Sequence, residues 1–227
     1  MKKLLVGICT LFLLTGCFNS KNTSSKDLKV DLNDAKGIAY DYVLTSDSII
    51  LSITNETKDL IDFINVDLAI YDEDNKLIRV EKQSIRNLEA KKTNVVKVYY
   101  KNTTAKKEEK KPARIEVAVS NVNYETEVET SYVSKVEATV SKTKTEGEFT
   151  LNVKNNSGVT LDDLNVAVVF YKNSKIVDIY EASAQKVDSE YNTTIYLPVQ
   201  AKDDGTASYI KYDDMKVIVN NASVYNQ

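Results

Sequence analysis

The chain contains the same unit twice, about 100 residues apart. Leu51–Asn55 faces Leu151–Asn155, and Asn65-Val66 faces Asn165-Val166. Apolar residues match apolar residues at nearly every alternate position, and Tyr71 coincides with Tyr171. Repetition on this scale means that each unit folds as one structural module, so it limits the architectures available to the whole chain. The sequence therefore predicts two copies of one domain.

The two copies differ slightly in spacing. After the first third of the unit the offset falls to 99, so that residues 76–78 face residues 175–177. The same offset places residues 96–98 opposite residues 195–197, and the offset returns to 100 at Val117 and Val217. We expect loops of slightly different length in the two copies.

Each copy reads as a string of short β-strands. Residues 48–53 and 66–71 alternate apolar and polar side chains, a period of two that indicates half-buried strands. Clusters of Asn, Asp, Glu and Lys separate the strands, and no stretch keeps a helical period beyond about two turns. Six or seven such strands in roughly 95 residues are typical of a two-layer sandwich. The predicted fold is all-β, with two tandem immunoglobulin-like β-sandwich domains.

The repeat also sets the expected domain boundaries. The lysine-rich stretch Ala105–Lys111 aligns with residues 201–207, so we interpret it as a loop inside the first domain instead of a linker. The predicted domains span residues 35–125 and 130–227. Residues 17–34 are polar and precede the first strand, which favours a flexible tether.

The first 17 residues have the layout of a secretion signal. Lys2 and Lys3 are followed by an apolar run from Leu4 to Leu14, too short to span a bilayer, and then by small residues. The segment Leu14–Cys17 resembles the lipobox of bacterial lipoproteins. That resemblance implies a signal peptide of residues 1–16, a diacylglyceryl group on the Cys17 thiol, and an extracytoplasmic protein attached to the cell membrane. An ordinary secretory signal and a core helix with an incidental cysteine are the alternatives.

The composition excludes several classes of function. The chain has no histidine and two cysteines, of which Cys9 would be removed and Cys17 lipidated. Triads with histidine, thiol nucleophiles and cysteine-based metal sites are therefore excluded. The net charge is −3, and it becomes −5 once residues 1–16 and their two lysines are removed. We predict no enzyme, no cofactor and no nucleic-acid partner.

A second resemblance concerns the strand that leads into Tyr71. Leu68–Asp72, followed by Asn75–Ile78, resembles the signature of FxLYD-type domains, and Val168–Lys172 repeats it without the aspartate. In that family an apolar strand runs into Tyr-Asp and a turn. The resemblance implies an immunoglobulin-like sandwich of the kind found on surface lipoproteins, and it assigns no functional residue.

Candidate binding residues are few. Asp72, Asp74 and Asn75 place several oxygen ligands in one turn and could bind Ca²⁺, although a solvated hairpin turn is the favoured interpretation. Lys106–Lys111 could recognise an anionic polymer, but acidic residues interrupt it. Six tyrosines fall in or beside predicted strands and could form a binding face, or could be ordinary strand residues. They are Tyr40, Tyr42, Tyr99, Tyr100, Tyr191 and Tyr196.

These features favour a membrane-anchored, non-enzymatic module that engages an unidentified protein or cell-wall partner. A structural spacer, or an accessory of the envelope stress response, is the alternative. A hydrolase that uses carboxylates is a third and weaker hypothesis.

Overall fold

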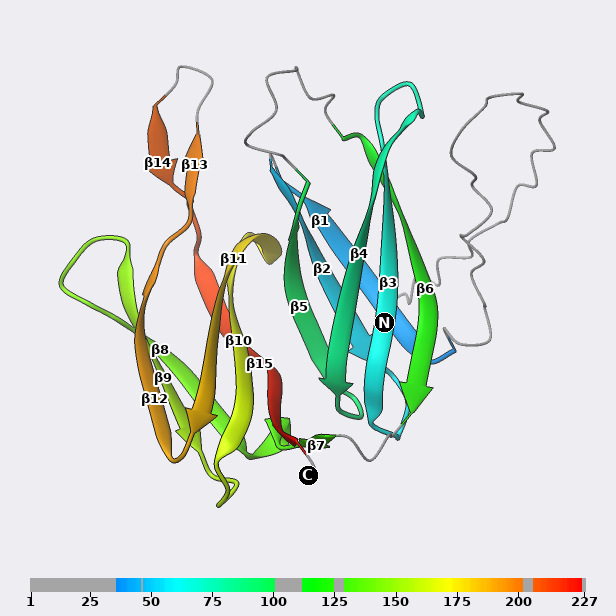
Figure 1. Ribbon diagram of the computed structural model, residues 1–227. Coiled ribbons are helices and arrows are strands. Elements are labelled where there is room, and N and C mark those ends of the chain that lie inside the picture. Colours follow the sequence, from blue (N-terminus) through cyan, green and yellow to red (C-terminus); the bar gives the residue numbers. More distant parts are fainter. Residues whose placement is uncertain (1–35, 46, 101–111, 125–128, 202–205, 226–227) are drawn as a thin grey trace, which may run out of the picture.

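The computed structural model describes residues 36–45, 47–100, 112–124, 129–201 and 206–225. These residues form antiparallel sheets and one 3-10 helix (Figure 1). The predicted signal peptide, Cys17, the tether and the loop of residues 105–111 lie outside the described residues. Within the described part, no helix is long and apolar enough to cross a membrane.

The first sandwich consists of two three-stranded sheets. Sheet A has the strand order β1-β2-β5, and sheet B has the order β4-β3-β6. The strands are β1 Ile38–Leu44, β2 Ser48–Asn55, β3 Ile61–Tyr71, β4 Leu77–Leu88, β5 Thr93–Tyr99 and β6 Arg114–Tyr124.

The second sandwich repeats this plan. Sheet D has the order β12-β9-β8, and sheet C has the order β11-β10-β15-β7. The helix η1, Val133–Lys135, leads from sheet C to sheet D, and a two-stranded ribbon of β13 and β14 extends from the end of the sandwich. The strands are β7 Glu129–Ser131, β8 Val136–Lys142, β9 Glu148–Asn155, β10 Leu161–Lys172, β11 Lys175–Val187, β12 Glu190–Tyr196, β13 Val199–Ala201, β14 Ala207–Tyr209 and β15 Asp214–Tyr225.

Backbone irregularities recur at the same places in both sandwiches. The pairing of the central strand shifts register after Asn65 in β3 and after Asn165 in β10. It shifts again before Tyr71 and before Tyr171. A β-bulge is specified by local sequence, so its repetition explains why these residues coincide in the sequence alignment. The predicted all-β class with tandem β-sandwiches is confirmed.

The register corrects one part of the sequence alignment. Val98 lies opposite Ile49, and Ile195 lies opposite Phe149, so β5 and β12 correspond at an offset of 97. The sequence alignment placed residue 98 opposite residue 197 and was wrong there by two positions. The cause is a difference in turn length. Four residues separate β4 from β5, whereas two residues separate β11 from β12.

Each sandwich has its own core. Side chains between sheets A and B, most of them aliphatic, form one buried cluster, and Leu51, Leu68 and Ile70 are among its fully buried members. A second cluster fills the space between sheets C and D and includes Phe149 and Phe170. Burial of this apolar surface is the main stabilising contribution to such a fold.

A third apolar cluster joins the two sandwiches. Ile50 and Val95 on the outer face of sheet A pack against Ala167, Val169 and Ile179 on the outer face of sheet C. All five side chains are at most 3% exposed. We call this contact between sheets A and C the seam. The four sheets therefore stack in the order B, A, C, D, and the sandwiches lie side by side (Figure 1).

Candidate functional site

The predicted calcium ligands lie in the hairpin turn between β3 and β4. Asp72 is buried, and its Oδ1 accepts hydrogen bonds from the backbone amides of Asp74 at 3.1 Å and Lys76 at 2.8 Å. The Asn75 side chain accepts a hydrogen bond from Arg114. The Asp72 carboxylate thus stabilises the turn, as the favoured interpretation of a hairpin requires. Among the described residues, no group of three or more His, Cys, Asp or Glu side chains could hold a metal ion.

The six candidate tyrosines occupy different environments. Tyr42 and Tyr191 pack against the two cores, and Tyr100 is buried with its hydroxyl donating to the Thr45 carbonyl at 2.6 Å. Tyr40, Tyr99 and Tyr196 are exposed, on β1, β5 and β12. Since sheets A and D are separated by sheet C, Tyr99 and Tyr196 do not share a face.

A buried ion pair lies in the seam. The Lys97 ammonium is 2.6 Å from Asp178 Oδ1, and both side chains are less than 10% exposed. Burial alone lowers the pKa of Lys97, but the hydrogen bond and negative charge of Asp178 outweigh it, so the pKa of Lys97 is raised. Burial raises the pKa of Glu181, on the same side of sheet C. A backbone hydrogen bond from Lys97 and the positive charge of Lys97 partly offset this rise. Buried charges require such partners, and the pair therefore ties β5 to β11.

Asparagines complete the polar part of the seam. The Asn220 amide donates to the Val95 carbonyl at 2.8 Å, and its Oδ1 accepts the Val95 amide at 2.9 Å. The Asn94 amide donates to the Asn220 carbonyl, and Asn87 donates to Asn221 Oδ1. The seam therefore satisfies its buried backbone groups by specific contacts, which fix one relative orientation.

Sequence reasoning missed the seam, although the sequence contains a signal for it. Several side chains on the outer face of sheet A pack in the seam. The equivalent positions on sheet D, whose outer face is solvated, carry polar residues. Val43, Ile50, Val95 and Lys97 correspond to Ser141, Thr150, Asn192 and Thr194. Ile50 in particular breaks the alternation of β2, and strands buried on both faces lose that alternation.

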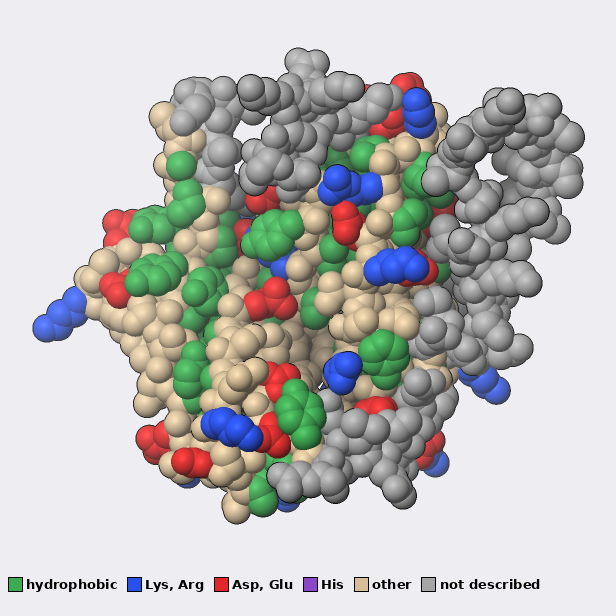
Figure 2. All heavy atoms as spheres, in the orientation of Figure 1, with side chains coloured by type: hydrophobic (Ala, Val, Ile, Leu, Met, Phe, Trp, Pro, Cys, Tyr) green, Lys and Arg blue, Asp and Glu red, His purple; other side chains and the backbone are tan. Residues whose placement is uncertain are grey.

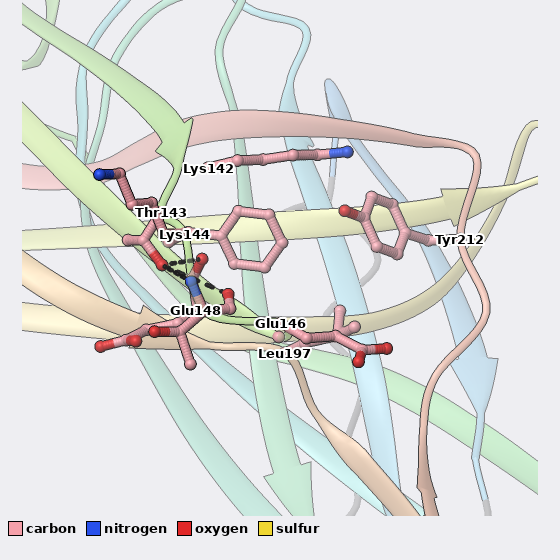
Figure 3. A pocket seen from close by; sticks show the side chains of 10 residues that line it. Lys142, Thr143, Lys144, Glu146, Glu148, Leu197 and Tyr212 are labelled. Atoms are coloured by element: carbon pink, nitrogen blue, oxygen red, sulfur yellow. Dashed lines mark hydrogen bonds between the residues drawn. The ribbon is translucent and has the colours of Figure 1, made fainter.

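The second sandwich has an opening at one end, which we call the end pocket. It has a volume of about 370 Å³ and is bounded by the turn between β8 and β9 (Figure 3). Phe149, Leu197 and Tyr212 contribute its apolar and aromatic lining, while Lys142 and Glu148 are among the charged residues that line it. Positive lysines and negative glutamates both line the end pocket. This mixture of charges suits a polar or zwitterionic ligand better than a ligand with a large net charge.

The turn that forms the rim is held by local contacts. The Thr143 hydroxyl donates to the Glu148 carbonyl at 3.1 Å and accepts the Thr145 amide at 3.1 Å (Figure 3). Gly147 has a φ of 75°, and the ring of Tyr209 lies directly over it. The Leu197 amide donates to the Gly147 carbonyl at 2.7 Å and joins the turn to the end of β12.

The first sandwich differs at the equivalent position. The Tyr100 amide donates to the Asp47 carbonyl as the Leu197 amide donates to the Gly147 carbonyl, so Tyr100 corresponds to Leu197. Three residues separate β1 from β2, whereas five separate β8 from β9. A buried tyrosine and a shorter turn therefore stand where the second sandwich has Leu197 and the longer turn that borders the end pocket.

A second opening lies at the edge of the second sandwich, beside the seam. We call it the edge groove; it has a volume of about 400 Å³. Its lining is mostly aliphatic: Val133, Val136, Ala138, Val217, Ile218 and Val219, with Lys92 and Thr93 contributed by the first sandwich.

The equivalent edge of the first sandwich has tyrosines. The register places Tyr40 where the second sandwich has Ala138, and Tyr42 where it has Val140. The Tyr42 hydroxyl reaches across the edge to the Ile115 carbonyl at 3.5 Å. Both openings of the second sandwich thus coincide with tyrosines of the first.

The visible surface has no strongly charged face. Figure 2 shows acidic and basic side chains interspersed over the described residues, without an extended patch of one sign. Arg114 stacks on the Tyr71 ring at 4.0 Å and forms an ion pair with Glu116. The Arg114 hydrogen bond is the main cause of the lowered pKa of Glu116. Surface pairs of this kind contribute little to stability.

Comparisons with known proteins do not identify a family. No family model matches the chain, and no curated protein sequence matches it significantly. A transglutaminase of red sea bream aligns over 82% of this chain and 29% of its own length, at 11% identity and a TM-score of 0.23. A fucolectin from striped bass serum aligns over 82% and 86%, at 8% identity and a TM-score of 0.18. Both TM-scores are below 0.5, so these likenesses carry no argument, and this chain spans less than a third of the transglutaminase.

Proposed function

We propose that this chain is a lipid-anchored extracytoplasmic lipoprotein that acts as a non-enzymatic binding module of the bacterial cell envelope. The observation that carries the proposal is the asymmetry between the two copies. Tyr40 and Tyr100 occupy two positions of the first sandwich, whereas Ala138 and Leu197 leave openings at the same positions of the second. A repeat that serves only as a building block has no need for this difference. The second sandwich is the binding unit, and the first supports it through the seam.

The alternative, a spacer, receives less support from the arrangement of the sandwiches. Two tandem domains extend furthest when they are stacked end to end. Here they lie side by side, with a buried ion pair between Lys97 and Asp178 (Figure 1). Side-by-side packing sacrifices reach and produces a fixed composite surface, which favours binding.

The binding function is tested by filling both openings. The chain without residues 1–17 is immobilised, and envelope extracts are passed over the wild type and over the Ala138→Tyr/Leu197→Tyr variant. We expect a partner that is retained by the wild type and lost by the filled variant. Thr139→Tyr, which points away from the groove on sheet D, is the matched control and should retain it. Equal retention by the filled variant would show that the openings are not binding sites, and no retained partner would favour the spacer.

The membrane anchor is tested separately, because it depends on the first 17 residues alone. Cells expressing the full chain are labelled with a palmitate analogue, and the protein is followed in membrane and soluble fractions. We expect label in the wild type, whose two acyl chains give stable anchoring, and no label in Cys17→Ala. A labelled Cys17→Ala protein would contradict the lipidation.

A further inference from the structure

We infer that the edge groove is a docking site for an extended peptide segment that inserts one aromatic side chain against Ala138. This inference deepens the proposed binding function and rests on it.

The first argument is the unused edge of β15. β7 pairs with Ser223–Tyr225, the last residues of β15, on the side away from β10. Before these residues, the Ala222 carbonyl accepts the Tyr132 amide at 2.6 Å, and the Asn220 carbonyl accepts the Asn94 side-chain amide at 2.8 Å. Within the described part of the chain, no strand pairs with residues 214–219 on that side. An exposed strand edge is a template for an added strand. A peptide beside residues 214–219 would extend this edge of sheet C beyond β7 and η1.

The second argument is the shape of the groove. A strand added beside β15 points alternate side chains toward β8, where Val136 and Ala138 face Val217 and Val219. These four side chains are aliphatic and favour an apolar side chain of the occupant, while Lys92 is the charged residue in the groove lining. A volume of about 400 Å³ lies within the range of small-ligand sites and accommodates an aromatic ring.

The third argument comes from the repeat, which shows which side chains stand at the equivalent positions. Tyr40 stands at the position of Ala138, and the Tyr42 hydroxyl closes that edge against Ile115. The same fold therefore places aromatic rings on this edge. The second sandwich provides small residues at both positions, so the ring can come from outside.

The first sandwich also contributes to the groove. Lys92 and Thr93 form one wall. Thr93 is the first residue of β5, which continues into the seam through Asn94 and Val95. The groove is therefore continuous with an established interface. It is complete only when the two sandwiches are docked.

The probe is the synthetic peptide acetyl-Val-Thr-Tyr-Thr-Val-amide, whose alternation directs Val, Tyr and Val to one side. It is titrated into the isotopically labelled chain without residues 1–17, and amide chemical shifts are recorded. We expect shifts at β8 and β15 near Ala138 and Val217. The same peptide with alanine for tyrosine should bind at least about tenfold more weakly, because burial of an aromatic ring is lost.

The matched variants fill the groove. Ala138→Tyr copies the residue of the first sandwich and should abolish the shifts, whereas Thr139→Tyr should leave the affinity unchanged. If Ala138→Tyr does not fold, Ala138→Val fills less of the groove and should weaken binding severalfold. Either filled variant is compared with the wild type by its unfolding midpoint before titration.

Several outcomes would overturn the inference. These are the absence of shifts up to about 10 mM peptide, equal binding of the alanine peptide, and binding that persists in a folded Ala138→Tyr protein. Equal affinity for N-acetyl-tyrosinamide would show a small aromatic site in place of a strand-docking site. Groove shifts that depend on protein concentration alone would show a second copy as the occupant. Capture of an envelope partner by a chain that ignores the peptide would overturn this inference and leave the proposed function standing.

Discussion

Two asparagines explain why the repeat preserves particular residues. Asn155 Nδ2 donates to the carbonyls of Val159, Val187 and Asp188, and its Oδ1 accepts the amide and hydroxyl of Ser157. Asn55 makes the same kind of contacts with Thr57, Asp59 and Leu88 in the first sandwich. Only an amide side chain supplies a donor and an acceptor in this geometry. Asn55 is fully buried, and its contacts with Thr57 stabilise the turn that follows β2.

Replacing Asn155 should therefore be costly. Asn155→Ala leaves several buried carbonyl groups without their donor, and we expect the free energy of unfolding to fall by about 3 kcal/mol. Asn192→Ala, at an exposed position of sheet D, should change it by less than about 0.5 kcal/mol. Urea unfolding measures both. Similar losses for the two variants would mean that the turn contacts of Asn155 do not stabilise the fold.

At the level of elements, alternation predicted the strands better than it predicted their alignment. A shift of two residues leaves every side chain on the same face of a strand, so period-two patterning cannot detect it. The shorter turn between β11 and β12 is such a shift, and the sequence alignment of β5 with β12 missed it. The two openings depend on the same kind of detail. Ala138 and Leu197 are ordinary apolar residues until the register and the backbone hydrogen bonds show that Tyr40 and Tyr100 stand in their places.

Two glycines allow backbone strain to be separated from packing. Gly147 and Gly158 both have positive φ, of 75° and 79°, but a Cβ at Gly147 would lie 2.5 Å from the Tyr209 ring and one at Gly158 would meet nothing. Gly158→Ala should cost about 1 kcal/mol through strain alone. Gly147→Ala should cost more, because Tyr209 must also leave its position.

The Tyr209→Ala background tests this interpretation. There, Gly147→Ala should cost about as much as Gly158→Ala does, as measured by thermal unfolding of the four variants. An extra cost of Gly147→Ala that survives the removal of Tyr209 would place its cause in the backbone of the turn.

For the whole molecule, the seam determines whether the two sandwiches unfold together. Lys97→Met leaves Asp178 buried without its cation, and breaking such a pair costs about 3–5 kcal/mol. We expect one calorimetric transition for the wild type and two for Lys97→Met, as the sandwiches become independent. The double variant Lys97→Met/Asp178→Leu removes both charges and should recover most of the loss. A single transition in Lys97→Met would show that the apolar contacts of Ile50, Val95 and Val169 maintain the coupling without the ion pair.

The same ion pair predicts how the coupling depends on pH. The pKa of Lys97 is raised in the folded chain: burial opposes the charge, but the hydrogen bond and charge of Asp178 prevail. A lysine whose folded pKa exceeds the unfolded value of about 10.4 contributes its full stability below that value and loses it as the pH rises through the folded pKa. The difference in unfolding free energy between the wild type and Lys97→Met should therefore stay constant from about pH 6 to pH 10 and decrease above that range. Taking the difference cancels the ionisation of tyrosines that do not contact Lys97. Lys97 lies over the Tyr99 ring, so both proteins also carry Tyr99→Phe. A difference that already decreases near neutral pH would mean that Lys97 loses its proton inside the seam, and the two sandwiches would then be held together by apolar packing and the asparagine contacts alone.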